Sequence, residues 1–306
     1  MVVNTGDRSE SRRGLLVSNI AVLLFGLAGV LGKLSSLPAP LIVLGRVFFA
    51  GIVLGGVVLG RHVDMRARNR RDLALLIGQG VLLAVHWTAF FASIAVSNVA
   101  IGLLAFSSFP LFTAGLEPLL LRQRANRVQI AAVLIILVGI YLLVPSFSLA
   151  NAATLGVVLG LFAGATFALL SVVNRGLGAT YPSLTISLYQ DGIAAIVLLP
   201  TLFFLPTTGL FTLREIGILL LLGIGCTAIA HTLFIAGMRD ITAQLASLFG
   251  SLEPVWGVLF ALFLLREVPT ARTLLGGGII LAATIAPLFF QRNQRARGEK
   301  PLHQAS

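Results

Sequence analysis

The chain has 306 residues, of which 57% are hydrophobic and 11% charged, and its formal net charge is +11. A water-exposed surface needs roughly a quarter charged residues, so this composition excludes a soluble globular protein. Apolar segments of about 20 residues, the length that crosses ~30 Å of hydrocarbon, recur along the whole chain. The sequence therefore predicts an all-α polytopic membrane protein. Its single cysteine, Cys226, excludes an internal disulfide framework and a cysteine-rich metal site.

Ten transmembrane helices are expected, because backbone groups in lipid must be hydrogen-bonded within their own segment. The connections between them are short, which suits an antiparallel bundle. The two polar tails, residues 1–13 and 291–306, are expected to be disordered. The predicted spans lie at about 14–32, 40–60, 73–94, 100–121, 128–144, 154–173, 183–205, 215–236, 243–265 and 273–290.

The positions of lysine and arginine in the connections predict the orientation, since cytoplasmic loops carry the excess of positive charge. With the N-terminus inside, 17 of the 22 basic residues fall on the cytoplasmic side. Four fall outside, namely Lys33, Arg214, Arg266 and Arg272, and Arg46 lies within a span. Both termini are therefore predicted to be cytoplasmic, in a bacterial cytoplasmic membrane. The basic charge is a topology signal first and a contact with anionic lipids second, and nucleic acid is not expected as a partner.

An internal duplication is visible at an offset of 144 residues. The sequence Leu120-Leu121-Arg122 recurs as Leu264-Leu265-Arg266, and Pro110 falls on Pro254. The halves, at about 14–144 and 154–290, would each contain five spans. Because five is an odd number, the halves would enter the membrane in opposite senses, and inverted repeats are the architecture of alternating access.

Pro110 and Pro254 each lie about ten residues into a predicted span, roughly 15 Å deep. Each removes a backbone hydrogen bond and bends its helix. A matched pair of bends predicts hinges, with the binding site at the interface between the repeats. The alternative is structural, because proline is common in membrane helices.

Glu253 is the strongest candidate among the ionisable groups inside the predicted spans. It precedes Pro254 and shares a helix face with small residues, which leave room for a ligand or for close packing. Intramembrane carboxylates usually face the bundle interior. Glu253 is thus a candidate for substrate binding or proton coupling, and the alternative is a protonated glutamate bonded to a neighbouring helix.

A second candidate is a polar and aromatic stripe in the third span. His86 shares a face with Gln79, Phe90 and Ser93, whereas Trp87 is expected to point elsewhere on the helix. This stripe suits a cavity wall. A histidine bonded to a backbone carbonyl is the alternative interpretation.

Three further residues complete the list of candidates. Asp191 lies too deep in the seventh span to reach water easily, and Trp256 adds an aromatic group that could face the lipid instead. Arg46 could anchor a carboxylate, although its long stem could equally reach the membrane interface.

Two sets of glycines form faces with small residues at every fourth position, which let helices approach closely. One set, Gly156, Gly160 and Gly164, lies in the sixth span, and the other, Gly51 and Gly55, lies in the second.

Several catalytic signatures are missing from the sequence. There is no Walker lysine loop, no HExxH motif, no nucleophile elbow and no metal-site spacing among the four histidines. An enzymatic function therefore has no residues on which to depend, and no cofactor is expected.

The second half carries a family pattern. It reads Ser251-Leu252-Glu253-Pro254-Val255, then Leu264-Leu265-Arg266-Glu267-x-Pro269-Thr270 and a glycine-rich apolar run. This pattern resembles the EamA family of the drug/metabolite transporter superfamily, with Arg266-Glu267 standing where the family usually carries Gly-Glu. The resemblance implies ten helices in two EamA repeats, and a central cavity formed by spans 1–4 and 6–9. It also implies export of amino acids and other small metabolites from the bacterial cytoplasm.

The first hypothesis is thus a secondary-active exporter of small metabolites, amino acids above all and aromatic or other neutral ones among them. His86, Phe90, Trp256, Asp191 and Glu253 are its candidate cavity groups. Two alternatives stay open: a non-transporting, lipid-binding membrane scaffold, and a facilitative channel. Its expected partners are a small-molecule substrate and membrane lipids, and a monomer is one of the oligomeric states that the sequence leaves open.

Overall fold

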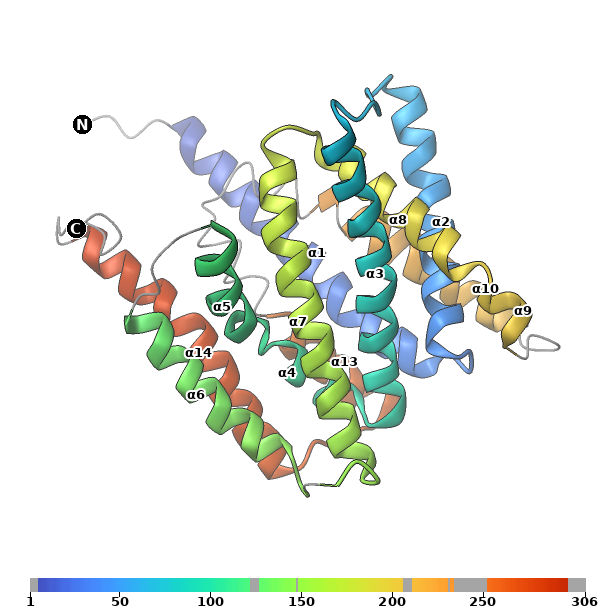
Figure 1. Ribbon diagram of the computed structural model, residues 1–306. Helices are drawn as coiled ribbons and strands as arrows, with labels where there is room; N and C mark the ends of the chain where they lie inside the picture. The colour runs from blue at the N-terminus through green and yellow to red at the C-terminus, as the bar shows by residue number, and fades with distance from the viewer. Residues whose placement is uncertain are drawn as a thin grey trace.

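The computed structural model describes residues 5–121, 127–146, 148–205, 211–230, 232–233 and 252–296, and this part of the chain contains helices without strands. Figure 1 shows the helices packed as one bundle. In chain order they are α1 (Thr5–Leu34), α2 (Ala39–Gly60), α3 (Arg70–Val96), α4 (Val99–Phe106), α5 (Phe109–Leu121), α6 (Arg127–Leu143), α7 (Ala152–Gly178), α8 (Ser183–Leu198), α9 (Thr201–Phe204), α10 (Leu213–Leu220), the π-helix η1 (Leu221–Ile229), α13 (Glu253–Phe260), the π-helix η2 (Ala261–Leu265) and α14 (Ala271–Ala296).

Five of the described helical segments are long and apolar enough to cross a membrane: Gly14–Leu34, Ala39–Gly60, Arg70–Val96, Ala152–Gly178 and Ser183–Phe204. Shorter apolar segments lie at Val99–Thr113, Ile130–Leu143, Glu253–Leu265 and Ala271–Ala286. Large apolar side chains also cover the outside of the bundle, where Phe48 is 54% and Phe204 85% exposed. An apolar outer surface of this extent suits lipid rather than water, so the chain is a multi-pass membrane protein.

The described helices lie where the sequence predicted apolar spans, with corrections at three places. The fourth predicted span is divided by a break at Ser107 and Ser108 into α4 and α5. The tails are more ordered than expected, since α1 begins at Thr5 and α14 continues to Ala296. The start of the ninth predicted span, residues 243–251, lies outside the described residues.

Helix starts in the two halves use the same local chemistry. Pro38 precedes α2 with φ −56° and ψ 144°, and Pro182, 144 positions later, precedes α8 with φ −57° and ψ 141°. The Asn69 side chain accepts from the Asp72 backbone N–H at the start of α3, as Thr212 does from Glu215 at the start of α10. Such caps satisfy backbone N–H groups that have no partner within the helix.

Contacts between helices persist when the halves are exchanged. Helix α1 of the first half packs on α13 of the second, and the matching contact is that of α7 of the second half on α4 and α5 of the first. Likewise α3 packs on α7 and α8, whereas η1 packs on α1 and α2. Helices α2 and α8 are equivalent in the two halves and pack on each other, as do α6 and α14, so exchange of the halves leaves these two contacts unchanged. The interface between the two halves is therefore built from pairs of matching helix contacts.

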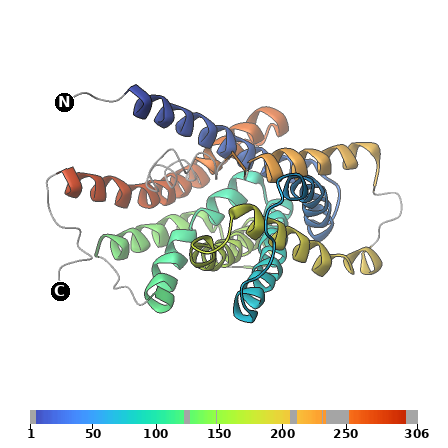
Figure 2. The same ribbon diagram turned by 90° about the horizontal axis from the view of Figure 1, so that it is seen from above.

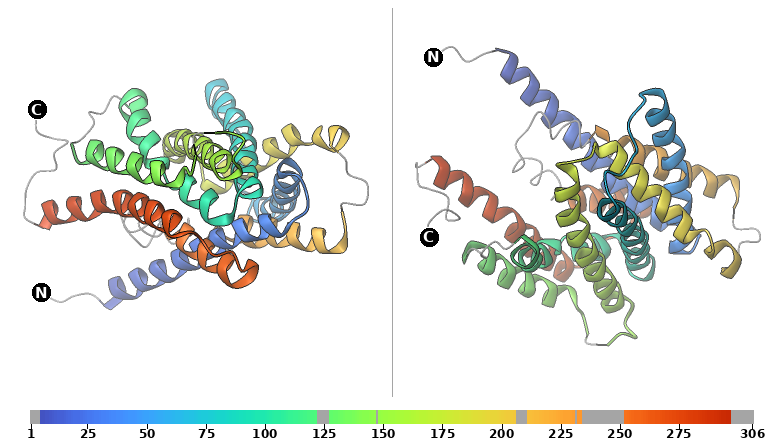
Figure 3. Two further views of the ribbon diagram at one scale, coloured as in Figure 1. Left: turned by 90° about the horizontal axis from the view of Figure 1, so that it is seen from below. Right: turned by 45° about the horizontal axis from the view of Figure 1, so that its top comes forward.

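Helices α6 and α14 lie side by side at one edge of the bundle, away from α2, in each of the views in Figures 1 to 3. They are antiparallel, because Arg272 at the start of α14 donates to the carbonyls of Leu142 and Val144 at the end of α6. A Cβ atom added to Gly139 would lie 2.7 Å from the Gly276 carbonyl oxygen, so the two backbones nearly touch.

The predicted glycine faces have different outcomes. The face of α7 is a packing surface, because Cβ atoms added to Gly156, Gly160 and Gly164 would collide with or crowd residues 93–109 of the neighbouring helices. Among the described residues, none lies within 4 Å of such a Cβ on Gly51 or Gly55 in α2. The prediction that they pack against another helix was wrong.

Candidate functional site

A cavity of about 220 Å³ lies in the middle of the bundle. Its wall combines residues of α1, α2, α3 and α4 from the first half with residues of α7, α8 and α13 from the second. Helices α6 and α14, at the edge of the bundle, contribute none of its lining residues. The cavity is therefore shared between the two halves, where the matched prolines predicted a binding site.

Arg46 of α2 lies in the cavity wall and is 3% exposed. Its guanidinium carbon is 3.9 Å from the centroid of the Trp87 ring and 5.3 Å from that of Phe91, the geometry of a cation–π contact. The interpretation in which Arg46 extends to the membrane interface was therefore wrong. Trp87, expected to point elsewhere, also lines the cavity.

The π-helix η1 supplies the hydrogen-bond acceptor for Arg46. Nε and Nη2 of Arg46 donate to Thr227 Oγ1 at 3.1 and 2.9 Å. The Thr227 hydroxyl in turn donates to the Leu222 carbonyl, five residues earlier, at 2.8 Å. A π-helical turn brings residues five apart into register and is frequent at functional sites, so the irregular backbone of η1 holds Thr227 toward Arg46.

His86 belongs to an aromatic cluster in the cavity wall. Its ring centroid lies 6.5 Å from that of Phe90, 5.7 Å from Phe106 and 5.5 Å from Phe167. Nδ1 of His86 is 2.9 Å from the Ala163 carbonyl oxygen, so the protonated form of this nitrogen donates to α7. Of the predicted stripe, His86 and Phe90 line the cavity, whereas the Ser93 hydroxyl donates to the Gly156 carbonyl at 2.6 Å. His86 is thus both a cavity residue and bonded to a backbone carbonyl.

Gln79 reaches the cavity through a neighbour. It is 2% exposed, and its Oε1 accepts from Gln190 Nε2 at 3.2 Å. The same Gln190 nitrogen donates to Asn174 Oδ1 at 3.0 Å. Gln190 and Asn174 line the cavity, whereas Gln79 stands behind them. These amides form a polar strip that joins α3, α7 and α8.

The two acidic candidates differ in their position. Glu253, in the first turn of α13, is half-buried and lines the cavity. Asp191 of α8 is 3% exposed and is not among the lining residues, although its neighbour Gln190 is. Trp256 packs against Phe260 outside the cavity, and its indole Nε1 is buried without a partner among the described residues.

The matched prolines both occupy the first turn of a helix. Pro110 follows the break at Ser107 and Ser108, where the two hydroxyls donate to the carbonyls of Leu103 and Ala105. Pro254 is the second residue of α13, and the residues 234–251 before it lie outside the described part. The first turn tolerates proline because its N–H would lack a helical partner. Pro110 is therefore part of a broken helix rather than of a smooth bend.

Two matched side-chain clamps tie the halves together and were not found from the sequence. In the Asp72 clamp, Asp72 at the start of α3 accepts from the Tyr181 hydroxyl, in the turn before α8, at 2.7 Å. In the Glu215 clamp, Glu215 at the start of α10 accepts from the hydroxyls of Ser35 and Ser36, in the turn before α2, at 2.6 and 2.8 Å. The sequence did hold a signal for them, because Asp72 and Glu215 each follow a helix-capping residue by three positions, Asn69 and Thr212.

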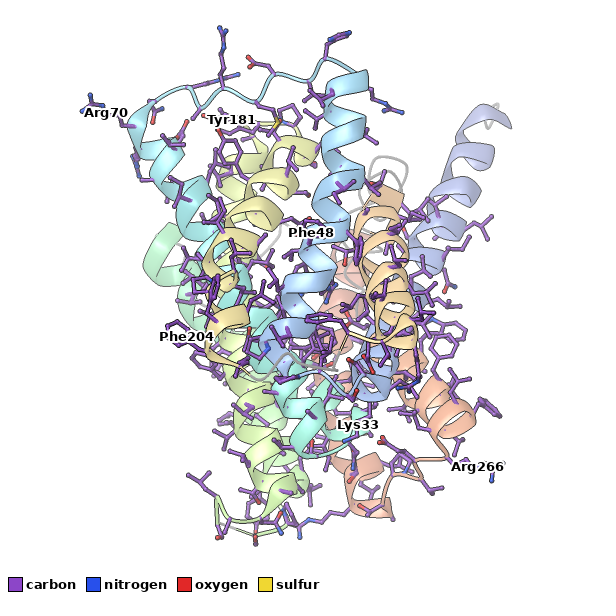
Figure 4. The ribbon with its side chains drawn as sticks, turned by 90° about the vertical axis from the view of Figure 1, so that its right-hand side faces the viewer. Lys33, Phe48, Arg70, Tyr181, Phe204 and Arg266 are labelled. Carbon is purple, nitrogen blue, oxygen red and sulfur yellow. The ribbon has the colours of Figure 1, made fainter. Side chains whose placement is uncertain are left out.

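The clamps lie at opposite ends of the bundle. Figure 4 shows Tyr181 near Arg70 at one end, with Lys33 and Arg266 at the other. Glu215 belongs to the second end, because Arg214 beside it donates to the Leu34 carbonyl at 2.8 Å, next to Lys33. Each clamp thus joins one half to the other at one end of the cavity-bearing bundle.

A helical membrane bundle whose two halves share a partly polar cavity across matching helix contacts has the features of a transporter. The model of the EamA-like transporter family matches residues 12–144 and again residues 154–288. The chain belongs to the EamA-like transporter family. The relatives described next are also named as transporters, as expected for a protein without catalytic motifs.

Three relatives illustrate the range of this family. The chain is 28% identical over 288 residues to the Pseudopaline exporter CntI of Pseudomonas aeruginosa, which covers 90% of this chain and 95% of that protein. It is 27% identical to the uncharacterized transporter YwfM of Bacillus subtilis, over 70% of this chain and 73% of the relative. It is 26% identical to the S-adenosylmethionine uptake transporter of Rickettsia bellii, over 82% and 84%.

The fold is also similar to that of a solved crystal structure, with a TM-score of 0.65 at 21% identity. This match covers 91% of the chain and 97% of the solved structure. The likeness supports the arrangement of helices along nearly the whole chain.

Proposed function

We propose that the protein is a secondary-active exporter of small metabolites, in particular neutral and aromatic amino acids, in a bacterial cytoplasmic membrane. Ten helices would cross the membrane, as two inverted five-helix repeats at about 14–144 and 154–290, with both tails in the cytoplasm. Alternating access would proceed by exchange between two equivalent packings of the repeats.

One observation carries this proposal: a small, partly polar cavity lies between two units whose helix contacts persist when the units are exchanged. In such a bundle, exchange of the packing between the two halves would give a second arrangement, open to the other side of the membrane. A facilitative channel would need a continuous path instead. The proposed direction follows the family resemblance, and the relative named as an exporter supports it by spanning 90% of this chain.

Counterflow in proteoliposomes tests the proposal. Vesicles are loaded with a high concentration of an unlabelled amino acid, and the uptake of the same compound in labelled form is measured over time. A carrier gives a transient overshoot of label above its equilibrium level. The overshoot arises because efflux of the unlabelled compound returns the binding site to the outside, where it takes up labelled compound. A channel gives a monotonic approach to equilibrium, and a lipid-binding scaffold gives no flux.

A further inference from the structure

We propose that Arg46 binds the carboxylate of the transported molecule, and that the cavity takes a zwitterion with an apolar or aromatic side chain. This inference rests on the proposed transport function and deepens it by naming the group that recognises the substrate. It is carried by the hydrogen bonds of Arg46, by the charges around the cavity and by the cavity wall.

The guanidinium of Arg46 has unused hydrogen-bond donors in a buried place. A charged side chain within a membrane costs at least ~2.5 kcal/mol on insertion scales, and such groups normally find partners. Of the five N–H donors of an arginine, two are directed to Thr227 Oγ1. Among the described residues, Nη1 of Arg46 has no hydrogen-bond acceptor, and Arg46 forms part of the cavity wall.

The side chain is held in an orientation that suits a carboxylate. The Trp87 ring supports one face of the guanidinium, and the hydroxyl of Thr227 holds its Nε and Nη2 atoms. The remaining donors are on Nη1 and the second hydrogen of Nη2, which together form a planar fork. Two parallel N–H···O bonds from such a fork are the preferred geometry for carboxylate recognition.

The charges around the cavity favour a zwitterion over a simple anion. Glu253 lines the same cavity, and buried Asp191 follows the cavity-lining Gln190 in α8. Among the described residues, the ion pair within 4.0 Å is that of Arg214 with Glu215. Arg46 forms no such pair with a described residue. A substrate that carries both a carboxylate and an ammonium would satisfy the arginine and an acid without adding net charge to the membrane interior.

The rest of the wall determines the size and polarity of the ligand. Phe90, Phe106 and Phe167 provide aromatic surface next to the polar groups. The volume of about 220 Å³ is below the ~300–1,000 Å³ of pockets for drug-sized ligands. The cavity therefore suits a molecule of the size of one amino acid, with its side chain against the phenylalanines.

The test uses matched ligands on the purified, detergent-solubilised protein. Thermal unfolding is measured with L-leucine, L-methionine, L-phenylalanine and L-tryptophan, and with the amide of each, which keeps the ammonium but lacks the carboxylate. We expect at least one amino acid to raise the Tm and its amide to leave the Tm unchanged. The proposal is overturned if no amino acid raises the Tm, or if the amides do so equally well.

Variants then assign the effect to Arg46. Arg46→Gln should weaken the apparent affinity for the stabilising amino acid by about 10- to 100-fold, the range for loss of a charged hydrogen bond. Arg46→Lys should recover part of it, because a charge remains without the fork. Arg61→Gln, the same change at an exposed position that ends the same helix, should leave the affinity unchanged.

The comparison of acids with amides needs only the unaltered protein, so it decides the question even if Arg46→Gln does not fold. Unchanged affinity in a folded Arg46→Gln variant overturns the proposal. In that case, counterflow of another labelled metabolite would show that transport stands and that the carboxylate site alone has failed. Loss of all counterflow, with amino-acid binding intact, would instead overturn the transport function.

Discussion

Arg266 ends η2 with φ 57° and ψ 27°, in the left-handed region that favours glycine. The family pattern that this sequence resembles carries glycine at this place, and the backbone conformation explains why. The next residue, Glu267, accepts from the Val99 backbone N–H at 3.0 Å and thereby satisfies the first turn of α4. Glycine would adopt this turn without strain, and Glu267 uses the turn to join the second half to α4 of the first.

Replacing Arg266 with glycine should therefore stabilise the protein. The left-handed conformation costs a residue with a Cβ about 1–2 kcal/mol of folding free energy. Glycine avoids this cost, but it loses more conformational entropy on folding, which offsets part of the gain. We expect Arg266→Gly to raise the free energy of unfolding by about 1 kcal/mol, measured as a higher Tm in detergent. Arg266→Ala keeps the strain and serves as the control, and an equal gain in that variant would assign the effect to charge instead.

A second prediction at this scale concerns Glu253, which lines the cavity beside Pro254. If this carboxyl carries the coupled proton, removal of its titration should remove the response of transport to pH. We expect Glu253→Gln to flatten the pH profile of uptake into proteoliposomes, with Asp191→Asn measured in parallel. A profile of unaltered shape in Glu253→Gln would take that role away from Glu253.

At the scale of elements, the Asp72 and Glu215 clamps lie at opposite ends of the bundle and join opposite halves. Alternating access requires that one end opens while the other stays closed. Removal of one clamp should therefore favour opening at its own end. Tyr181→Phe breaks the Asp72 clamp at its hydroxyl, and a Ser35→Ala, Ser36→Ala double variant weakens the Glu215 clamp.

The effect can be measured with a cysteine in the cavity wall. Ser171→Cys, in a Cys226→Ser background, places one thiol on the cavity-lining face of α7. With Tyr181→Phe, we expect faster reaction with an impermeant maleimide from the cytoplasmic side, and with the serine variant, faster reaction from outside. Equal changes from both sides would indicate general loosening rather than gating.

The break between α4 and α5 leads to a separate prediction. Pro110 prevents a continuous helix by removing a backbone donor two residues after the Ser107 and Ser108 turn. Pro110→Ala permits helix across the break. If the break is a hinge, this variant should bind substrate with a similar Kd but transport it with a lower maximal rate. A similar loss of binding would show that the break shapes the cavity instead.

The sequence predicted more of the fold than of the site, for physical reasons. Apolar length and the spacing of prolines are local properties, so the helices and the pairing of Pro110 with Pro254 could be read directly. The orientation of Arg46 could not, because it depends on Trp87 of α3 and Thr227 of η1. The Asp72 and Glu215 clamps likewise join residues about 110 and 180 positions apart, which no local pattern reports.

For the whole molecule, the central claim is that two five-helix units enter one membrane in opposite senses around a shared cavity. Figure 4 places Arg70 at one end of the bundle and Lys33 and Arg266 at the other. Exposed Leu149 lies between α6 and α7, in the connection between the proposed units. If the N-terminal tail is cytoplasmic and each unit has five spans, Leu149 lies outside the cell and the C-terminal tail is again cytoplasmic.

Side-specific cysteine labelling on intact cells tests this claim most directly. In a Cys226→Ser background, single cysteines are placed at Leu149, Arg266, Arg66, Ser9 and Ser306 and treated with an impermeant maleimide. We predict that Leu149→Cys and Arg266→Cys react on intact cells, and that Arg66→Cys, Ser9→Cys and Ser306→Cys react after permeabilisation alone. Labelling of Ser9→Cys and Ser306→Cys from opposite sides of the membrane would contradict the account.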